Sequence, residues 1–130
     1  LANSRQGTET ELRAYRSYCE AVAYAPQDID ENLRSRLFTY RGAMLKRLNR
    51  PSDALPDIQY GLSLARQDRE KGDALYNQAC VFAQLGETKR LYETMRSMRA
   101  YPQFFAYALA DTEGYFAEYS SDEKFRTRDF

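Results

Sequence analysis

Apolar side chains recur at three- and four-residue steps along most of the chain. This spacing places them on one face of an α-helix, whereas a half-buried β-strand requires apolar and polar residues to alternate. No stretch shows sustained alternation, so the sequence predicts an all-α protein. Capping signals, including a capping box that starts at Thr8 and an acidic start at Asp28, mark the helix beginnings. We expect helices at residues 8–26, 28–49, 52–65, 68–86 and 87–100, with short helices after Pro102.

Small residues recur at equivalent positions of the predicted helices. Gly42 is followed twelve residues later by Ala54 in the next helix, and Ala79 is followed at the same distance by Leu91. A small side chain at a helix crossing allows a close approach that leucine would block. The shared offset favours two copies of one helix pair over an ordinary core helix that happens to contain alanine.

These positions resemble the tetratricopeptide repeat, which alternates bulky, small and aromatic residues over two helices. The matching residues are Phe38, Gly42, Leu45, Ala54 and Ile58 in the first copy, and Leu75, Ala79, Phe82, Leu91 and Met95 in the second. From the core positions of the repeat we expect burial of Phe38, Leu45, Ile58, Leu62, Leu75, Phe82 and Met95.

The resemblance implies one domain in which antiparallel helix pairs stack as a short α-solenoid. Residues 1–26 would form a half repeat, residues 28–68 and 69–101 two full repeats, and residues 102–130 a C-terminal cap. The copies are spaced more widely than the family period of about 34 residues. Arg41 and Gln78 also stand where the family usually has leucine.

The last section of the chain is rich in aromatic residues, too rich for a disordered tail. Its segment DTEGYFAEYSSDEKF resembles the end-of-array segment of many bacterial proteins of the same family. A stack of helices needs a cover over its last apolar face. We therefore expect residues 102–130 to form an aromatic-rich helical cap.

Composition excludes several classes of function. The 19 basic and 19 acidic residues cancel, so no overall field would attract nucleic acid or an anionic membrane. The chain has no histidine, which removes His-based catalysis and most zinc sites. No apolar run approaches the ~20 residues that span a bilayer. We expect no catalytic residues, no metal or other cofactor, and no nucleic-acid or membrane partner.

The cysteines and the acidic clusters have simple structural explanations. Cys19 and Cys80 lie on separate predicted helices without metal-ligand spacing, which is typical of buried thiols in a reducing, cytoplasmic setting. A disulfide or a reactive thiol is the alternative. Carboxylates near Asp28, Asp68 and Asp122 lie at predicted helix starts, where they are favoured as caps and by the helix dipole.

Every charged residue from Arg34 to Arg50 is basic. The steps between Arg36, Tyr40 and Arg47 place these three on one helical face. In the tetratricopeptide family the first helix of each pair lines a concave groove, so the resemblance implies a peptide-binding groove that contains them together with Tyr76 and Asn77. Asn77 also matches an asparagine with which some members hold a peptide's terminal carboxylate, although the other positions of that clamp are not matched. The alternative is a solvated face whose cations suit a helix C-terminus.

The sequence as a whole predicts a protein–protein interaction scaffold that binds an extended or helical segment of acidic character. The alternative is an architectural or oligomerisation segment of a larger protein, without a ligand of its own. The first predicted helix matches only half a repeat, so its apolar face needs cover from the next helix, from upstream residues or from a second copy. Because the chain starts at Leu1 rather than Met, we expect it to continue upstream. Self-association through the N-terminal helix is the other expected interaction.

Overall fold

The computed structural model describes the backbone of residues 2–130 and the side chains of residues 8–130. All regular structure in this part of the chain is helical, which confirms the predicted all-α class. The helices are α1 (Ala2–Tyr24), α2 (Glu31–Arg47), α3 (Pro51–Leu64), α4 (Asp68–Leu85), α5 (Thr88–Met98), α6 (Pro102–Ala110) and α7 (Glu123–Thr127), with a 3₁₀ turn, η1, at Ala117–Tyr119.

Most helix ends follow from local sequence signals. The Asp30 carboxylate caps α2 by accepting hydrogen bonds from the N–H groups of Asn32 and Leu33 at 2.9 and 3.1 Å. These donors would otherwise lack partners at the helix start. Pro51 begins α3, where its missing N–H group is not needed. Gly86 ends α4 with a φ of 69°, a left-handed conformation that glycine adopts without steric cost.

Two of the predicted helix starts are wrong. Helix α1 already begins at Ala2, so the capping-box pattern at Thr8 lies inside the helix. Such a pattern marks a start only where the preceding residues leave helical geometry, and no proline interrupts residues 2–7. Asp30 rather than Asp28 caps α2, because residues 27–29 still form the turn after Pro26.

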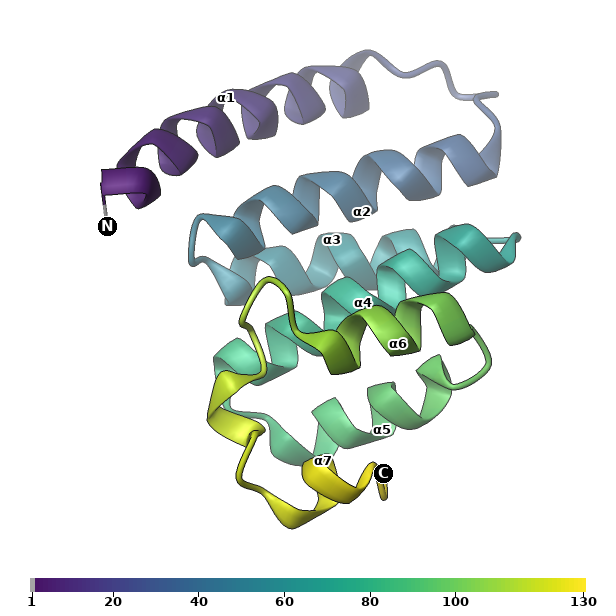
Figure 1. Cartoon of the computed structure of the whole chain (residues 1–130). Helices are drawn as coiled ribbons and strands as arrows, with labels where there is room; N and C mark the ends of the chain where they lie inside the picture. Colours follow the sequence, from purple (N-terminus) through teal and green to yellow (C-terminus); the bar gives the residue numbers. More distant parts are fainter. Residues whose placement is uncertain (1) are drawn as a thin grey trace.

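The helices pack as consecutive neighbours (Figure 1). Helix α1 packs along α2 at one end of the molecule, and α5 with the C-terminal residues lies at the other end. Helix α4 is central, because it packs against α2, α3, α5 and α6. The pairs α2–α3 and α4–α5 are the two helix pairs that the repeat positions predict.

The pair α2–α3 is held by an unusually close contact. An ideal Cβ added to Gly42 of α2 would lie 2.6 Å from Ile58 Cγ1 and 3.0 Å from the Ala54 carbonyl oxygen. Ala54 and Ile58 are fully buried. Ala79, the equivalent of Gly42 in the second pair, is also fully buried. The close approach expected at the small position of the first pair is therefore present.

Five of the seven side chains expected in the core are buried: Leu45, Ile58, Leu75, Phe82 and Met95. Phe38 and Leu62 are only half-buried, which contradicts the prediction. Phe38 lies at the margin of the α2–α3 pair, where its ring packs edge-on against Tyr60 with the centroids 4.6 Å apart. Because α2 and α3 approach so closely at Gly42, there is no room for a ring between them, and Phe38 packs at the edge of the pair instead.

The C-terminal section buries its aromatic rings against α4 and α5. Phe116, Tyr119 and Phe130 are buried in the same cluster as Leu91 and Met95. Asp122 caps the short helix α7 by accepting hydrogen bonds from the Lys124 and Phe125 N–H groups. Residues 102–130 are thus a packed part of the domain.

Candidate binding cleft

A cleft of about 550 Å³ lies between α1, α2, α4 and α6. Gly72 allows α4 and α6 to approach closely, because an ideal Cβ at this position would lie 2.2 Å from the Phe104 ring of α6. The lining combines aromatic and charged side chains. The aromatic residues are Tyr18, Tyr40, Tyr76, Phe104 and Tyr107, and the polar residues include Lys46, Arg47, Asp73, Asn77 and Glu113.

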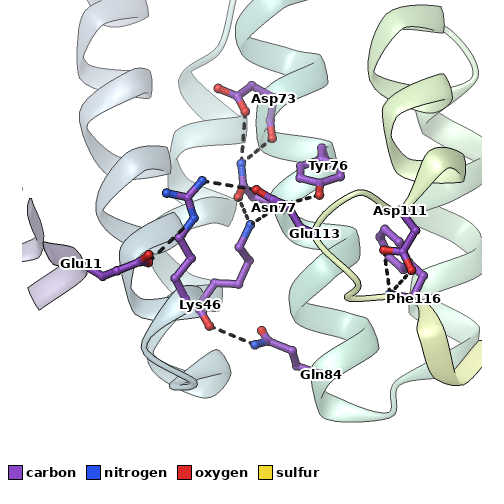
Figure 2. Close-up of polar contacts among 10 residues, drawn as sticks. Glu11, Lys46, Asp73, Tyr76, Asn77, Gln84, Asp111, Glu113 and Phe116 are labelled. Carbon is purple, nitrogen blue, oxygen red and sulfur yellow. Dashed lines mark hydrogen bonds and ion pairs between the residues drawn. The ribbon is translucent and has the colours of Figure 1, made fainter. Parts of the chain in front are cut away.

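Lys46 is the most unusual residue of the cleft, because its side chain is only 1% exposed. Its ammonium group donates a hydrogen bond of 2.7 Å to Asn77 Oδ1 and lies 3.7 Å from Glu113 Oε2 (Figure 2). The same nitrogen lies 4.6 Å from the Tyr115 ring centroid and 5.3 Å from that of Tyr76. Ring faces and a carboxylate both favour a cation. Lys46 is therefore held inside the protein as a paired ammonium ion.

Glu113 reaches the cleft from the loop after α6. The loop turns at Asp111, whose φ is 50°, and the Asp111 carboxylate accepts a hydrogen bond from the Phe116 N–H group at 3.2 Å. The Glu113 carboxylate accepts a hydrogen bond of 2.7 Å from the Tyr76 hydroxyl (Figure 2). Its other oxygen lies 3.4 Å from the Arg47 guanidinium. One carboxylate thus connects three lining residues from two helices.

The pKa values of Lys46 and Glu113 are both lowered, which disfavours the charged form of the lysine and favours that of the glutamate. Burial lowers the pKa of Lys46, and the nearby Glu113 charge acts against that shift. Burial alone would raise the pKa of Glu113, but the Tyr76 hydrogen bond and the charges of Lys46 and Arg47 together lower it. The carboxylate is therefore ionised at neutral pH, and it is the main charge that compensates the buried lysine.

Asp73 is a second carboxylate in the lining, one turn before Asn77 on α4. It accepts a hydrogen bond of 3.2 Å from Asn77 Nδ2 (Figure 2). Burial raises the pKa of Asp73, although Lys46, Arg69 and the Tyr40 hydroxyl act to lower it. Among the described side chains, none forms an ion pair with Asp73. Its charge is therefore less well compensated than that of Glu113.

The structure brings four of the five predicted groove residues together: Tyr40, Arg47, Tyr76 and Asn77 all line the cleft. Arg36 is not among the lining residues. Its guanidinium points to the buried Glu70 of α4, with Arg36 Nε and Glu70 Oε1 3.7 Å apart. The helical spacing correctly places Arg36 on the same face of α2 as Tyr40 and Arg47. Its side chain lies against Glu70, however, and not in the cleft.

The basic stretch from Arg34 to Arg50 is matched by partners within the same chain. Arg34 donates to the carbonyl oxygens of Pro26 and Gln27. The others form ion pairs: Arg36 with Glu70, Arg41 with Asp57, Lys46 with Glu113, Arg47 with Glu11 and Glu113, and Arg50 with Asp53. Apart from the local pair Arg50–Asp53, these pairs join α2 to another helix or to the loop after α6. Most of the stretch is therefore neither a free basic groove nor a simply solvated face.

Sequence reasoning missed Lys46 and Glu113 as site residues. Lys46 directly precedes Arg47, a predicted groove residue, and a lysine in a sequence is usually expected at the surface. The available signal was the DTEG segment, in which Asp111 and Gly114 favour a tight turn that projects the two residues between them, Thr112 and Glu113. That signal locates a turn, but it does not indicate which helix the glutamate contacts.

The cysteines are free thiols on separate helices. Cys80 is fully buried, as expected, and burial raises its pKa to about 12. A thiol with a raised pKa is a weak nucleophile, because the thiolate is the reactive form. Cys19 is half-buried on α1.

Tyr76 of the cleft and Tyr115, whose ring also faces Lys46, predict sensitivity to alkali. Burial raises the pKa values of Tyr76 and Tyr115 above the ordinary value of about 10. The unfolded chain therefore loses these protons first, so stability should fall as the pH rises above about 10. We expect phenolate absorbance from these residues to appear together with the loss of helical circular dichroism. Titration in denaturant is the control, and full tyrosine ionisation of a still-helical protein would contradict the prediction.

Among residues 8–130, no group of three or more His, Cys, Asp or Glu side chains is placed to hold a metal ion. No helix in the described part of the chain is both long and apolar enough to cross a membrane. No family model matches the chain, and no solved structure matches it significantly. The resemblance to the tetratricopeptide repeat therefore has no support from a comparison with known proteins.

Proposed function

We propose that this protein is an interaction scaffold that binds an extended or helical segment of another protein in the cleft between α1, α2, α4 and α6. The observation that carries the proposal is the lining, in which aromatic rings from four helices surround a space of about 550 Å³. Rigid aromatic side chains with polar edges supply much of the contact area in protein interfaces. Tyr107, at the edge of the cleft, remains 43% exposed and free to contact a ligand.

We further propose that α2–α3 and α4–α5 are tetratricopeptide-like repeats and that the module works in the cytoplasm. The first proposal is supported by the close contact at Gly42 and by the burial of Ala79 at the equivalent position. The second is supported by Cys19 and Cys80, which are both free thiols, as is usual in a reducing compartment.

An acidic segment could bind in the cleft only near Arg47, the one lining cation with an exposed side chain. Of the six cations between Arg34 and Arg50, Lys46 and Arg47 line the cleft, and Lys46 is almost fully covered. Arg47 keeps 40% of its side chain exposed, but it already pairs with Glu11 and Glu113. A ligand carboxylate would have to compete with those two groups.

Selection from a library of short random peptides displayed on phage tests the proposal. Peptides enriched on the wild-type protein would be synthesised and their Kd values measured by isothermal titration calorimetry. Replacing Tyr107 by alanine should weaken binding about tenfold, the effect of losing a typical interface aromatic residue. Tyr60→Ala is the matched control, because Tyr60 is 45% exposed on α3 and does not line the cleft. Failure to enrich any peptide, or equal effects of the two variants, would contradict the proposal.

The alternative is an architectural or oligomerisation segment. It is favoured by α1, which packs along α2 and leaves Leu12 on its surface 38% exposed. Under this alternative no peptide is enriched. Sedimentation would instead show an association that Leu12→Asp dissociates.

A further inference from the structure

The walls of the cleft carry two pairs of tyrosines. Tyr18 of α1 and Tyr40 of α2 lie with their ring centroids 5.9 Å apart. Tyr76 of α4 and Tyr107 of α6 lie with their centroids 5.0 Å apart. All four rings line the same cleft. A cation placed against such rings is stabilised by their quadrupoles, and the gain is largest where water is excluded.

The charges of the cleft leave one carboxylate without a cationic partner. The two lining cations, Lys46 and Arg47, are paired with Glu113 and Glu11. Asp73 lines the same cleft and has a hydrogen bond from Asn77 but no ion pair with a described side chain. The lining itself carries two cations and two carboxylates, but both cations lie against Glu113, so Asp73 is the lining charge without an ion pair to a described side chain. The cleft is therefore locally acidic at Asp73, although the sequence of α2 predicts a basic groove.

Asp73 and the tyrosine walls are close together. Asp73 and Tyr76 are three residues apart on α4, which places them on the same helical face. The Tyr40 hydroxyl of the opposite wall is near enough to act on the Asp73 pKa. The carboxylate thus lies beside both pairs of rings.

The protein already contains one example of this chemistry. Lys46 places its ammonium group near the rings of Tyr76 and Tyr115, next to the carboxylate of Glu113. Asp73 with Tyr40 and Tyr107 offers a comparable set of groups in the same cleft, where no described side chain forms an ion pair with Asp73.

We propose that the cleft recognises a lysine or arginine side chain of the bound segment, held beside Asp73 and against the tyrosine rings. This inference rests on the proposed peptide-binding function and names the ligand chemistry for the same cleft. It reverses the charge preference expected from the sequence, because the cations of α2 are already neutralised within the chain.

The test uses the peptides enriched on the wild-type protein. They should share a lysine or arginine at one position. Replacing that residue by norleucine keeps the four-carbon chain of lysine and removes its charged amine. Calorimetry should then show a Kd raised about tenfold, the loss expected for a desolvated contact of a cation with aromatic rings and a carboxylate.

The Asp73→Asn variant links the effect to this residue. It should bind the lysine and norleucine peptides with similar Kd values, whereas the control variant Glu93→Gln, an exposed change on α5, should keep the wild-type difference. Circular dichroism would verify that both variants are folded. Enriched peptides without a shared basic residue, equal binding of the norleucine peptide, or preference for a glutamate at that position would overturn the inference and leave peptide binding standing. Enrichment of no peptide would overturn both proposals.

Discussion

Replacing Glu113 by alanine should lower the free energy of unfolding by about 3 kcal/mol, because Lys46 would lose its only carboxylate partner among the described side chains. Breaking a buried ion pair typically costs about 3–5 kcal/mol. We expect the lower end, since Asn77 and the tyrosine rings still contact the ammonium group and Glu113 itself is a quarter exposed, so water can enter. Urea denaturation followed by circular dichroism measures the change.

Glu118→Ala is the matched control, because Glu118 is an exposed acid of the same C-terminal section. Its effect should stay within about 0.5 kcal/mol. Lys46→Met provides a second check, since it removes the charge that Glu113 compensates. In the Lys46→Met background, Glu113→Ala should cost clearly less than it does in the wild-type protein. Equal costs in both backgrounds would show that Lys46 and Glu113 are not coupled.

The helices could be predicted because their signals are local. Gly86, Pro51 and Asp122 each end or begin a helix by backbone geometry or by a single side-chain hydrogen bond. The start of α1 could not be predicted in this way, because the capping-box pattern at Thr8 marks a helix start only if the preceding residues are not helical. Such a condition depends on the whole segment rather than on the motif.

The candidate site was predictable in part. Helical spacing places Tyr40 and Arg47 on one face of α2, and the repeat resemblance adds Tyr76 and Asn77 from α4; all four line the cleft. Spacing says nothing about which acids approach from elsewhere in the fold. Glu70 takes Arg36 away from the cleft, and Glu113 neutralises Lys46 from a loop far along the chain.

The charge of the cleft is for this reason the least predictable property of the site. A run of cations in the sequence gives a basic surface only if no acid packs against it. Here Glu11, Asp57, Glu70 and Glu113 come from three other helices and a loop. Asp73 forms no ion pair with a described side chain; the sequence explains it as one of several acids near a helix start, although the repeat resemblance also places it in the groove.

The second large effect is expected at Gly61 of α3, where alanine should destabilise the protein by about 2 kcal/mol. An ideal Cβ at this position would lie 2.2 Å from Thr39 Oγ1, 2.9 Å from the Ser35 carbonyl oxygen and 3.0 Å from the Thr39 nitrogen. Two of these atoms belong to the α2 backbone, so a side-chain rotation cannot relieve the contact. The Gly61 carbonyl oxygen also accepts a buried hydrogen bond of 2.6 Å from the Ser35 hydroxyl, which would be strained if the helices moved apart.

The sign of this prediction depends on two opposing effects. Alanine is the better helix former by about 1 kcal/mol, so at an open helical position the change would stabilise the protein. Overpacking costs about 1–3 kcal/mol, and backbone clashes favour the upper end of that range. Urea denaturation of Gly61→Ala should therefore show a net loss, while Gln59→Ala, an exposed change on the same helix, should change stability little. A Gly61→Ala protein as stable as the wild type would mean that α2 and α3 can separate without cost, and the close contact would then not hold the pair together.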